Sequence, residues 1–142
     1  MYLIGFPLLV VPAAVYAIIE FLMPGDTPAA FWSSVVTQLR LASGETWTLS
    51  AGDLLIAISI LILFVELLKA TRMTTRSIVD HLLSTLLFIA MLIAFLVVRQ
   101  FATGTFFLLL VISFVDVVGG FSVSIRTAQR NVAIDTDSAS RA

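Results

Sequence analysis

The chain has 142 residues, of which 60% are hydrophobic and only 12% are charged, and its mean hydropathy is +1.10. This composition is typical of an integral membrane protein, because a soluble domain of this length could not cover so much apolar surface. The net charge of −1 gives no support to nucleic-acid binding, the absence of cysteine excludes disulfides and thiolate sites, and one histidine is too few for a histidine-rich metal site.

Four apolar segments are candidates for membrane-spanning helices, which need about 20 residues each. They cover residues 3–23, 54–70, 78–98 and 102–125. In lipid every backbone polar group must be paired internally, so these segments should be helical. The connections between the last three are short, which favours antiparallel neighbours. The predicted fold is an all-α integral membrane protein, with residues 1–125 forming one antiparallel bundle of four transmembrane helices.

The only sizeable loop joins the first two spans. Its sequence "GDTPAAFWSSVVTQLRL" begins like a capped helix and then repeats apolar residues at helical spacing. We therefore expect a short interfacial helix at residues 28–41 in this external loop, with Trp32 and Trp47 as anchors at headgroup depth. This helix could be an anchoring flap over the helix ends, or a gate or partner-docking surface.

Lysine and arginine lie mainly on one side of the predicted topology. The second connection carries Lys69, Arg72 and Arg76, and the polar tail at residues 126–142 carries three arginines, whereas the first and third connections carry one arginine each. The positive-inside rule then places both termini in the cytoplasm. We expect the tail to add a helical turn or two to the last span and then to fray.

The run "LLLVISFVDVVGGFSVSIR" places Asp116 inside an apolar segment, close to the bilayer midplane. A charge at that depth costs about 2.5–3.5 kcal/mol on insertion scales, so the side chain should face protein or water. The small and polar residues at helical spacing around it favour a packed helix crossing. They are Ser113, Asp116, Gly119, Gly120 and Ser124.

Asp116 has two interpretations. It could bind a proton or a cation during transport, as intramembrane acids often do. Alternatively, a protonated Asp116 could donate a hydrogen bond across a tight helix crossing and fix how the helices meet. Possible partners for such a bond include Ser59, Ser84 and Thr85.

A second polar group is expected near the cytoplasmic interface. Its members are Glu66, Lys69, Arg72, His81 and Arg126. The group could be an interfacial salt-bridge cluster, worth about 0–1 kcal/mol per wet pair. It could also be the mouth of a proton path that leads from Glu66 and His81 to Asp116.

The sequence lacks the motifs of common enzyme sites. No glycine-rich loop follows a strand, no serine has a nucleophile-elbow context, and no acid pair lies at ligand spacing beside the histidine. We therefore expect no catalysis, no cofactor and no metal site.

From "VELLKATR" through "DHLLS" to "FVDVVGGFSVSIRTAQR", residues 54–131 resemble an uncharacterised family of small four-helix bacterial inner-membrane proteins. The resemblance implies a bacterial cytoplasmic-membrane location and no particular activity. Three functions remain open. One is an accessory or assembly subunit that packs against a larger membrane complex or forms a homo-oligomer, and another is a small channel or proton-coupled transporter that uses Asp116 and Glu66. The third is a sensor that recruits a soluble partner through the basic hairpin and tail.

Overall fold

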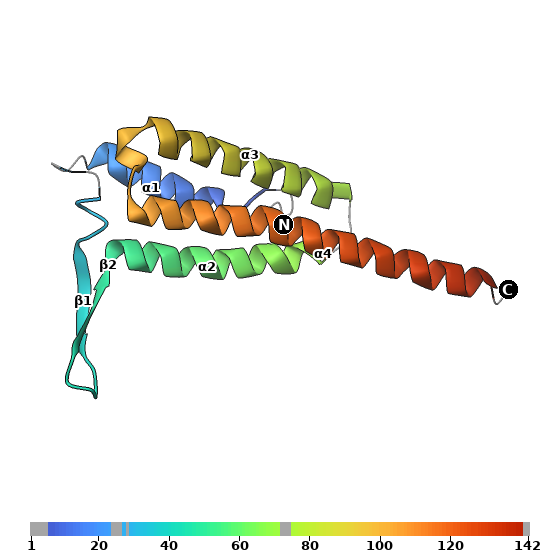
Figure 1. The fold of residues 1–142 in the computed structure, drawn as a ribbon, viewed down its shortest axis with the longest axis horizontal. Helices are drawn as coiled ribbons and strands as arrows, with labels where there is room; N and C mark the ends of the chain where they lie inside the picture. Colours follow the sequence, from blue (N-terminus) through green and yellow to red (C-terminus); the bar gives the residue numbers. More distant parts are fainter. Residues whose placement is uncertain (1–5, 24–26, 28, 72–74, 141–142) are drawn as a thin grey trace.

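The computed structural model describes residues 6–23, 27, 29–71 and 75–140, with side chains omitted at 75–78, 124, 127–128 and 130–140. The described chain is mostly helical, with three long helices side by side, a shorter helix against them and a small hairpin at one end (Figure 1). The elements are α1 (Val10–Leu22), β1 (Val35–Arg40), β2 (Thr46–Ser50), α2 (Ala51–Ala70), α3 (Thr75–Val97), a 3₁₀ turn η1 (Arg99–Phe101) and α4 (Gly104–Ser140).

Three of these helices are long and apolar enough to cross a membrane. The qualifying segments are Ala51–Ala70, Val79–Val97 and Gly104–Val123, which agree closely with the last three predicted spans. The fourth predicted span, residues 3–23, contains α1, whose 13 residues extend only about 20 Å at 1.5 Å per residue. The described part of the chain therefore shows three helices of spanning length and one shorter apolar helix.

The predicted interfacial helix at residues 28–41 is wrong, so the fold is not purely α-helical. Residues 35–40 and 46–50 instead form an antiparallel β-hairpin with Leu39 opposite Trp47. β1 contains two valines and one threonine, and β2 contains two threonines. Such β-branched residues favour strands over helices. Gly44 adopts a φ of +88° in the connecting turn, a conformation that glycine adopts without strain.

The start of α2 is fixed by a reciprocal cap. The Ser50 hydroxyl accepts a hydrogen bond from the Asp53 backbone N–H, and the Asp53 carboxylate accepts one from the Ser50 backbone N–H. Gly52 then lets α2 approach α4 closely, because a Cβ there would lie 2.6 Å from the Thr105 hydroxyl oxygen. Because of this cap, the end of the hairpin leads directly into the first of the three long apolar helices.

α4 is the longest element and packs against both α2 and α3 (Figure 1). It continues as helix to Ser140, whereas the sequence predicted only one or two further helical turns after the last span and then a frayed tail. At 1.5 Å per residue, 37 residues measure roughly 55 Å, well beyond the thickness of a bilayer core. The polar end of α4 therefore projects from the other helices.

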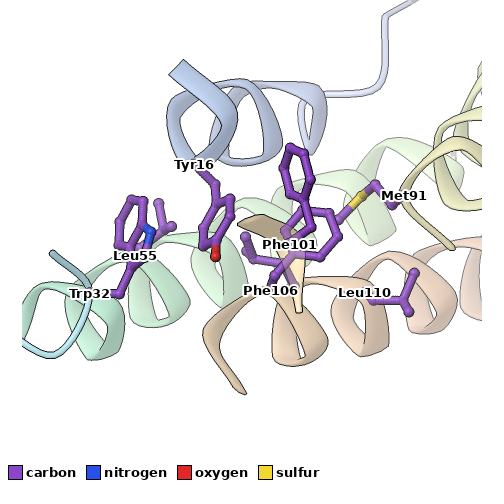
Figure 2. Packing of buried hydrophobic residues seen from close by; sticks show 8 residues of the cluster. Tyr16, Trp32, Leu55, Met91, Phe101, Phe106 and Leu110 are labelled. Atoms are coloured by element: carbon purple, nitrogen blue, oxygen red, sulfur yellow. The ribbon is translucent and has the colours of Figure 1, made fainter. Parts of the chain in front are cut away.

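The apolar core centres on Tyr16 of α1, near the hairpin end of the helices. Its ring is fully buried and stacks on Trp32 with ring centroids 4.6 Å apart, while Phe101 and Phe106 lie on its other side (Figure 2). The Tyr16 hydroxyl is 2.6 Å from the Thr103 hydroxyl. This contact ties α1 to the turn before α4.

Candidate functional site

A cluster of polar side chains lies between α2, α3 and α4, near the end of α2 that is remote from the hairpin. Four of its members are buried, with exposed fractions between 5% and 9%, and two more are partly buried. The buried residues are Glu66, His81, Ser84 and Asp116, and the other two are Lys69 and Asp80. Because its residues come from three helices, the polar cluster forms only when these helices pack together.

Helical spacing explains how each helix contributes its part. On α2, Glu66 and Lys69 are three residues apart, and on α3, Asp80 and Ser84 are four residues apart. Residues at these separations lie on one helix face. Asp116 faces these residues from α4. Its neighbours on the same helix face, Ser113 and Gly120, are also buried, so this face of α4 packs against the other helices.

Lys69 pairs with the two acids that lie nearest to it. Its ammonium nitrogen is 2.9 Å from Glu66 Oε2 and 4.0 Å from Asp80 Oδ2. Because the first pair is within one helix and the second joins α2 to α3, the lysine links the two helices electrostatically. The Lys69 ammonium is thus the cationic partner of both the Glu66 and the Asp80 carboxylates.

The segment before α1 covers the Glu66 side of the cluster. The backbone N–H of Leu8 donates a hydrogen bond to Glu66 Oε1, and the Lys69 ammonium donates one to the Phe6 carbonyl at 3.1 Å. Pro7 and Leu9 are buried beside these contacts. Both charged groups of the ion pair are therefore also held by main-chain groups of the N-terminal segment.

Asp116 is surrounded by polar groups from the two neighbouring helices. Its carboxyl group shares a hydrogen bond with Ser84 and lies within electrostatic reach of Glu66, Lys69 and His81. The His81 ring fits against α4 because residue 120 is glycine, where an added Cβ would lie 2.6 Å from the ring carbon Cε1. The glycine thus permits the histidine to stand beside the aspartate.

The six polar residues and Ala70 line a small cavity of about 20 Å³. A cavity of this size holds about one water molecule. Among the residues that the structure describes, Asp80 Oδ1 is buried without a hydrogen-bond partner. The cluster therefore combines a water-sized space with a buried carboxylate oxygen that lacks a hydrogen-bond partner.

Apart from this cluster, one more buried acid among the described residues lies near the opposite end of the helices. Glu20 of α1 is 7% exposed, and its Oε2 accepts a hydrogen bond of 3.0 Å from the Trp32 indole N–H. Trp32 is predicted as an interfacial anchor, but its side chain is buried and binds Glu20 inside the protein. Trp47 is on the hairpin and is about half exposed.

The predicted polar residues separate into three groups in the structure. Glu66, Lys69, His81 and Asp116 come together, whereas Arg126 is exposed on α4 and does not line the cavity. Arg72 and the side chain of Ser124 lie outside what the structure describes. A Cβ on Gly119 would meet Leu67 of α2 at 2.8 Å, which marks a close approach of α2 and α4.

Asp80 was missed as a member of the site. Asp80 directly precedes His81 in the sequence, but its contact with Lys69 joins two helices and has no local signal. Within the described ranges, no three acidic or histidine side chains converge as ligands of one metal ion.

Comparisons with protein-family models, with curated proteins and with solved structures find no match to this chain.

Proposed function

We propose that this chain is a small, non-enzymatic membrane protein that takes up and releases a proton at the Asp116 cluster, as a channel or proton-coupled transporter. The observation that carries the proposal is the gathering of three carboxyl groups, one lysine and one histidine around a water-sized cavity between three apolar helices. Polar groups of this kind are expensive inside a membrane and usually serve a function.

The charges of the cluster favour proton binding. Among the described residues that line the cavity, Glu66, Asp80 and Asp116 together carry more negative charge than Lys69 and His81 can balance, even when the imidazole is protonated. An uncompensated charge in an apolar interior costs several kcal/mol, and a bound proton removes it. The cluster can therefore hold a proton that is released when the surroundings of the carboxyl groups change.

The residues have separate roles in this proposal. Asp116 is the inner proton-binding group, held by Ser84 and placed on the helix that packs against both others. Glu66 and His81 exchange protons with Asp116 through the cavity, and Lys69 supplies the fixed countercharge. The N-terminal segment at Phe6 and Leu8 controls access, because it covers Glu66.

Proton flux into liposomes tests the proposal. The purified protein is reconstituted around a pH-sensitive dye, and a potassium diffusion potential drives proton entry. We expect Asp116→Asn to reduce flux to the level of protein-free liposomes while the protein stays folded, because asparagine keeps a hydrogen bond to Ser84 but carries no exchangeable acid.

The matched control is Asp53→Asn, which removes an exposed carboxylate from the first turn of α2 and should leave flux unchanged. Equal flux in the wild type and in Asp116→Asn would contradict a role of Asp116 in transport.

An accessory or assembly subunit is the second candidate. An open, entirely apolar groove of about 170 Å³ lies between Ala13 and Ala17 of α1 and Ala90 and Ala94 of α3. Small residues spaced four apart allow a further helix to approach closely, so the groove suits a membrane partner or a second copy. Extraction of the chain as a lone monomer in native nanodiscs would count against this candidate.

We also propose how the helices are arranged in the membrane. We infer an antiparallel transmembrane bundle in a bacterial cytoplasmic membrane, with α1 as the fourth member and both termini in the cytoplasm. The excess of lysine and arginine in the second connection and the tail supports this orientation. The resemblance of residues 54–131 to small bacterial inner-membrane proteins supports the location.

A further inference from the structure

The β-hairpin has one apolar face and one polar face. Cross-strand partners point to the same side of a hairpin, and successive pairs alternate between sides. The pairs Thr37–Leu49 and Leu39–Trp47 therefore share a face that carries three large apolar side chains. The opposite face is polar and consists of Gln38, Arg40, Thr46 and Thr48.

No described residue covers the apolar face near the tip of the hairpin. Leu39 and Trp47 are 57% and 47% exposed, although they are large apolar residues. The hairpin leaves the helices at the start of α2 and runs across their direction (Figure 1). If α2, α3 and α4 cross the bilayer, a hairpin with this direction lies along the membrane surface rather than out into water.

We propose that the hairpin is a lipid-binding element that lies flat in the bilayer interface, with Leu39, Trp47 and Leu49 directed into the headgroup and acyl-chain boundary. The apolar face is continuous in sequence with the exposed apolar surface of α2, where Leu54 and Ile58 follow the hairpin within three turns. Tryptophan favours this depth because its ring is apolar and its N–H is polar. Arg40, on the opposite face, remains in water or at phosphate groups.

This inference is independent of proton binding. The amphipathic hairpin takes the place of the predicted interfacial helix. Trp47 contacts the membrane, whereas Trp32 is buried in the protein. The occupant of the face is phospholipid, which surrounds the spanning helices.

Tryptophan quenching by lipids tests the inference, because the chain has only two tryptophans. The full-length protein is placed in nanodiscs of phosphatidylcholine brominated near the headgroup end of its acyl chains. The Trp47→Phe variant gives the emission of Trp32, and the difference from the wild type gives that of Trp47. We expect brominated lipid to remove most of the Trp47 component and iodide in the buffer to leave it largely unchanged.

A matched pair of variants tests which face is involved. Leu39→Asn weakens the apolar face and should lower lipid quenching of Trp47, whereas Gln38→Asn on the polar face should not. Strong quenching by iodide with none by brominated lipid would overturn the inference. Protection of Trp47 from both quenchers would also overturn it, in favour of a protein partner or a second copy on this face.

Discussion

Gly120 sets the distance between α4 and the only histidine of the chain. The His81 ring atoms Cε1 and Nδ1 lie 2.6 Å and 2.8 Å from the position that a Cβ on residue 120 would occupy. Real Cβ contacts are not that short, so any larger residue must push the ring or the helix aside. His81 keeps its place in the cluster because residue 120 has no side chain.

Gly120→Ala should therefore destabilise the protein. Overpacking of a close contact typically costs about 1–3 kcal/mol, because side chains leave their rotamers or the backbone moves. We expect a lower midpoint of thermal unfolding in detergent, followed by the helical circular dichroism signal.

Gly104→Ala is the control, because nothing lies within 4 Å of a Cβ at that position. If both variants unfold at the same temperature as the wild type, the close contact between α4 and His81 is not present in the membrane protein.

At the scale of residues, the sequence identifies Asp116 and Glu66 well because a charge inside an apolar run is conspicuous. The burial of Ser113, Asp116 and Gly120 follows from their spacing on one helix face. Asp80 could not be assigned to the cluster in the same way. Its meeting with Lys69 depends on how far α3 is shifted along α2, which no local pattern records.

Among the elements, α1 is linked to the first loop by the hydrogen bond between Glu20 and Trp32 and by the stacking of Trp32 on Tyr16. These contacts join a short helix to the beginning of the hairpin segment. They position α1 over the turn before α4, where Tyr16 meets Thr103.

Trp32→Phe should weaken this attachment. Phenylalanine keeps an aromatic ring against Tyr16 but leaves the buried Glu20 carboxylate without its indole donor. Loss of one partner of a buried hydrogen bond costs about 1–3 kcal/mol, and more for a charged group. We expect a lower thermal midpoint for Trp32→Phe, and almost none of this loss for Trp47→Phe on the exposed hairpin. Equal midpoints for the two variants would contradict the role of the Glu20 contact.

The elements of the first loop show why helical periodicity alone is insufficient. Phe31, Trp32, Val35 and Leu39 repeat at helical spacing, yet the segment pairs with residues 46–50. The β-branched residues of both strands and the glycine in the turn were the competing signals. The hairpin forms because β1 pairs with β2, which begins six residues after β1 ends. This pairing is not visible in the periodicity of the first segment alone.

For the whole molecule, three helices that are long and apolar enough to cross a membrane separate the hairpin from the end of α4. The two regions should therefore lie on opposite sides of the membrane. Because the chain contains no cysteine, single cysteines can be introduced at Thr46 and at Gln129, both exposed positions. In intact cells we expect an impermeant maleimide to label Thr46→Cys and to label Gln129→Cys only after permeabilisation. Labelling of both without permeabilisation would contradict an odd number of crossings.

The three long apolar helices could be predicted because they depend on hydropathy and length, which are local properties. The first predicted span was longer than the described α1, and the tail remained helical where its polarity suggested fraying. The joint cavity of the six polar residues arises only when three helices are assembled. A single sequence offers no signal for their relative rotation and shift.

The claim that the cluster around Asp116 binds a proton can be tested directly by infrared difference spectroscopy of the protein in lipid bilayers as the pH is changed. Protonated carboxyl groups have a separate carbonyl absorption, so the spectra report proton binding even when no transport occurs. We predict such a band in the wild type and in Asp53→Asn, and its loss in Asp116→Asn. Identical difference spectra for all three proteins would contradict proton binding at Asp116.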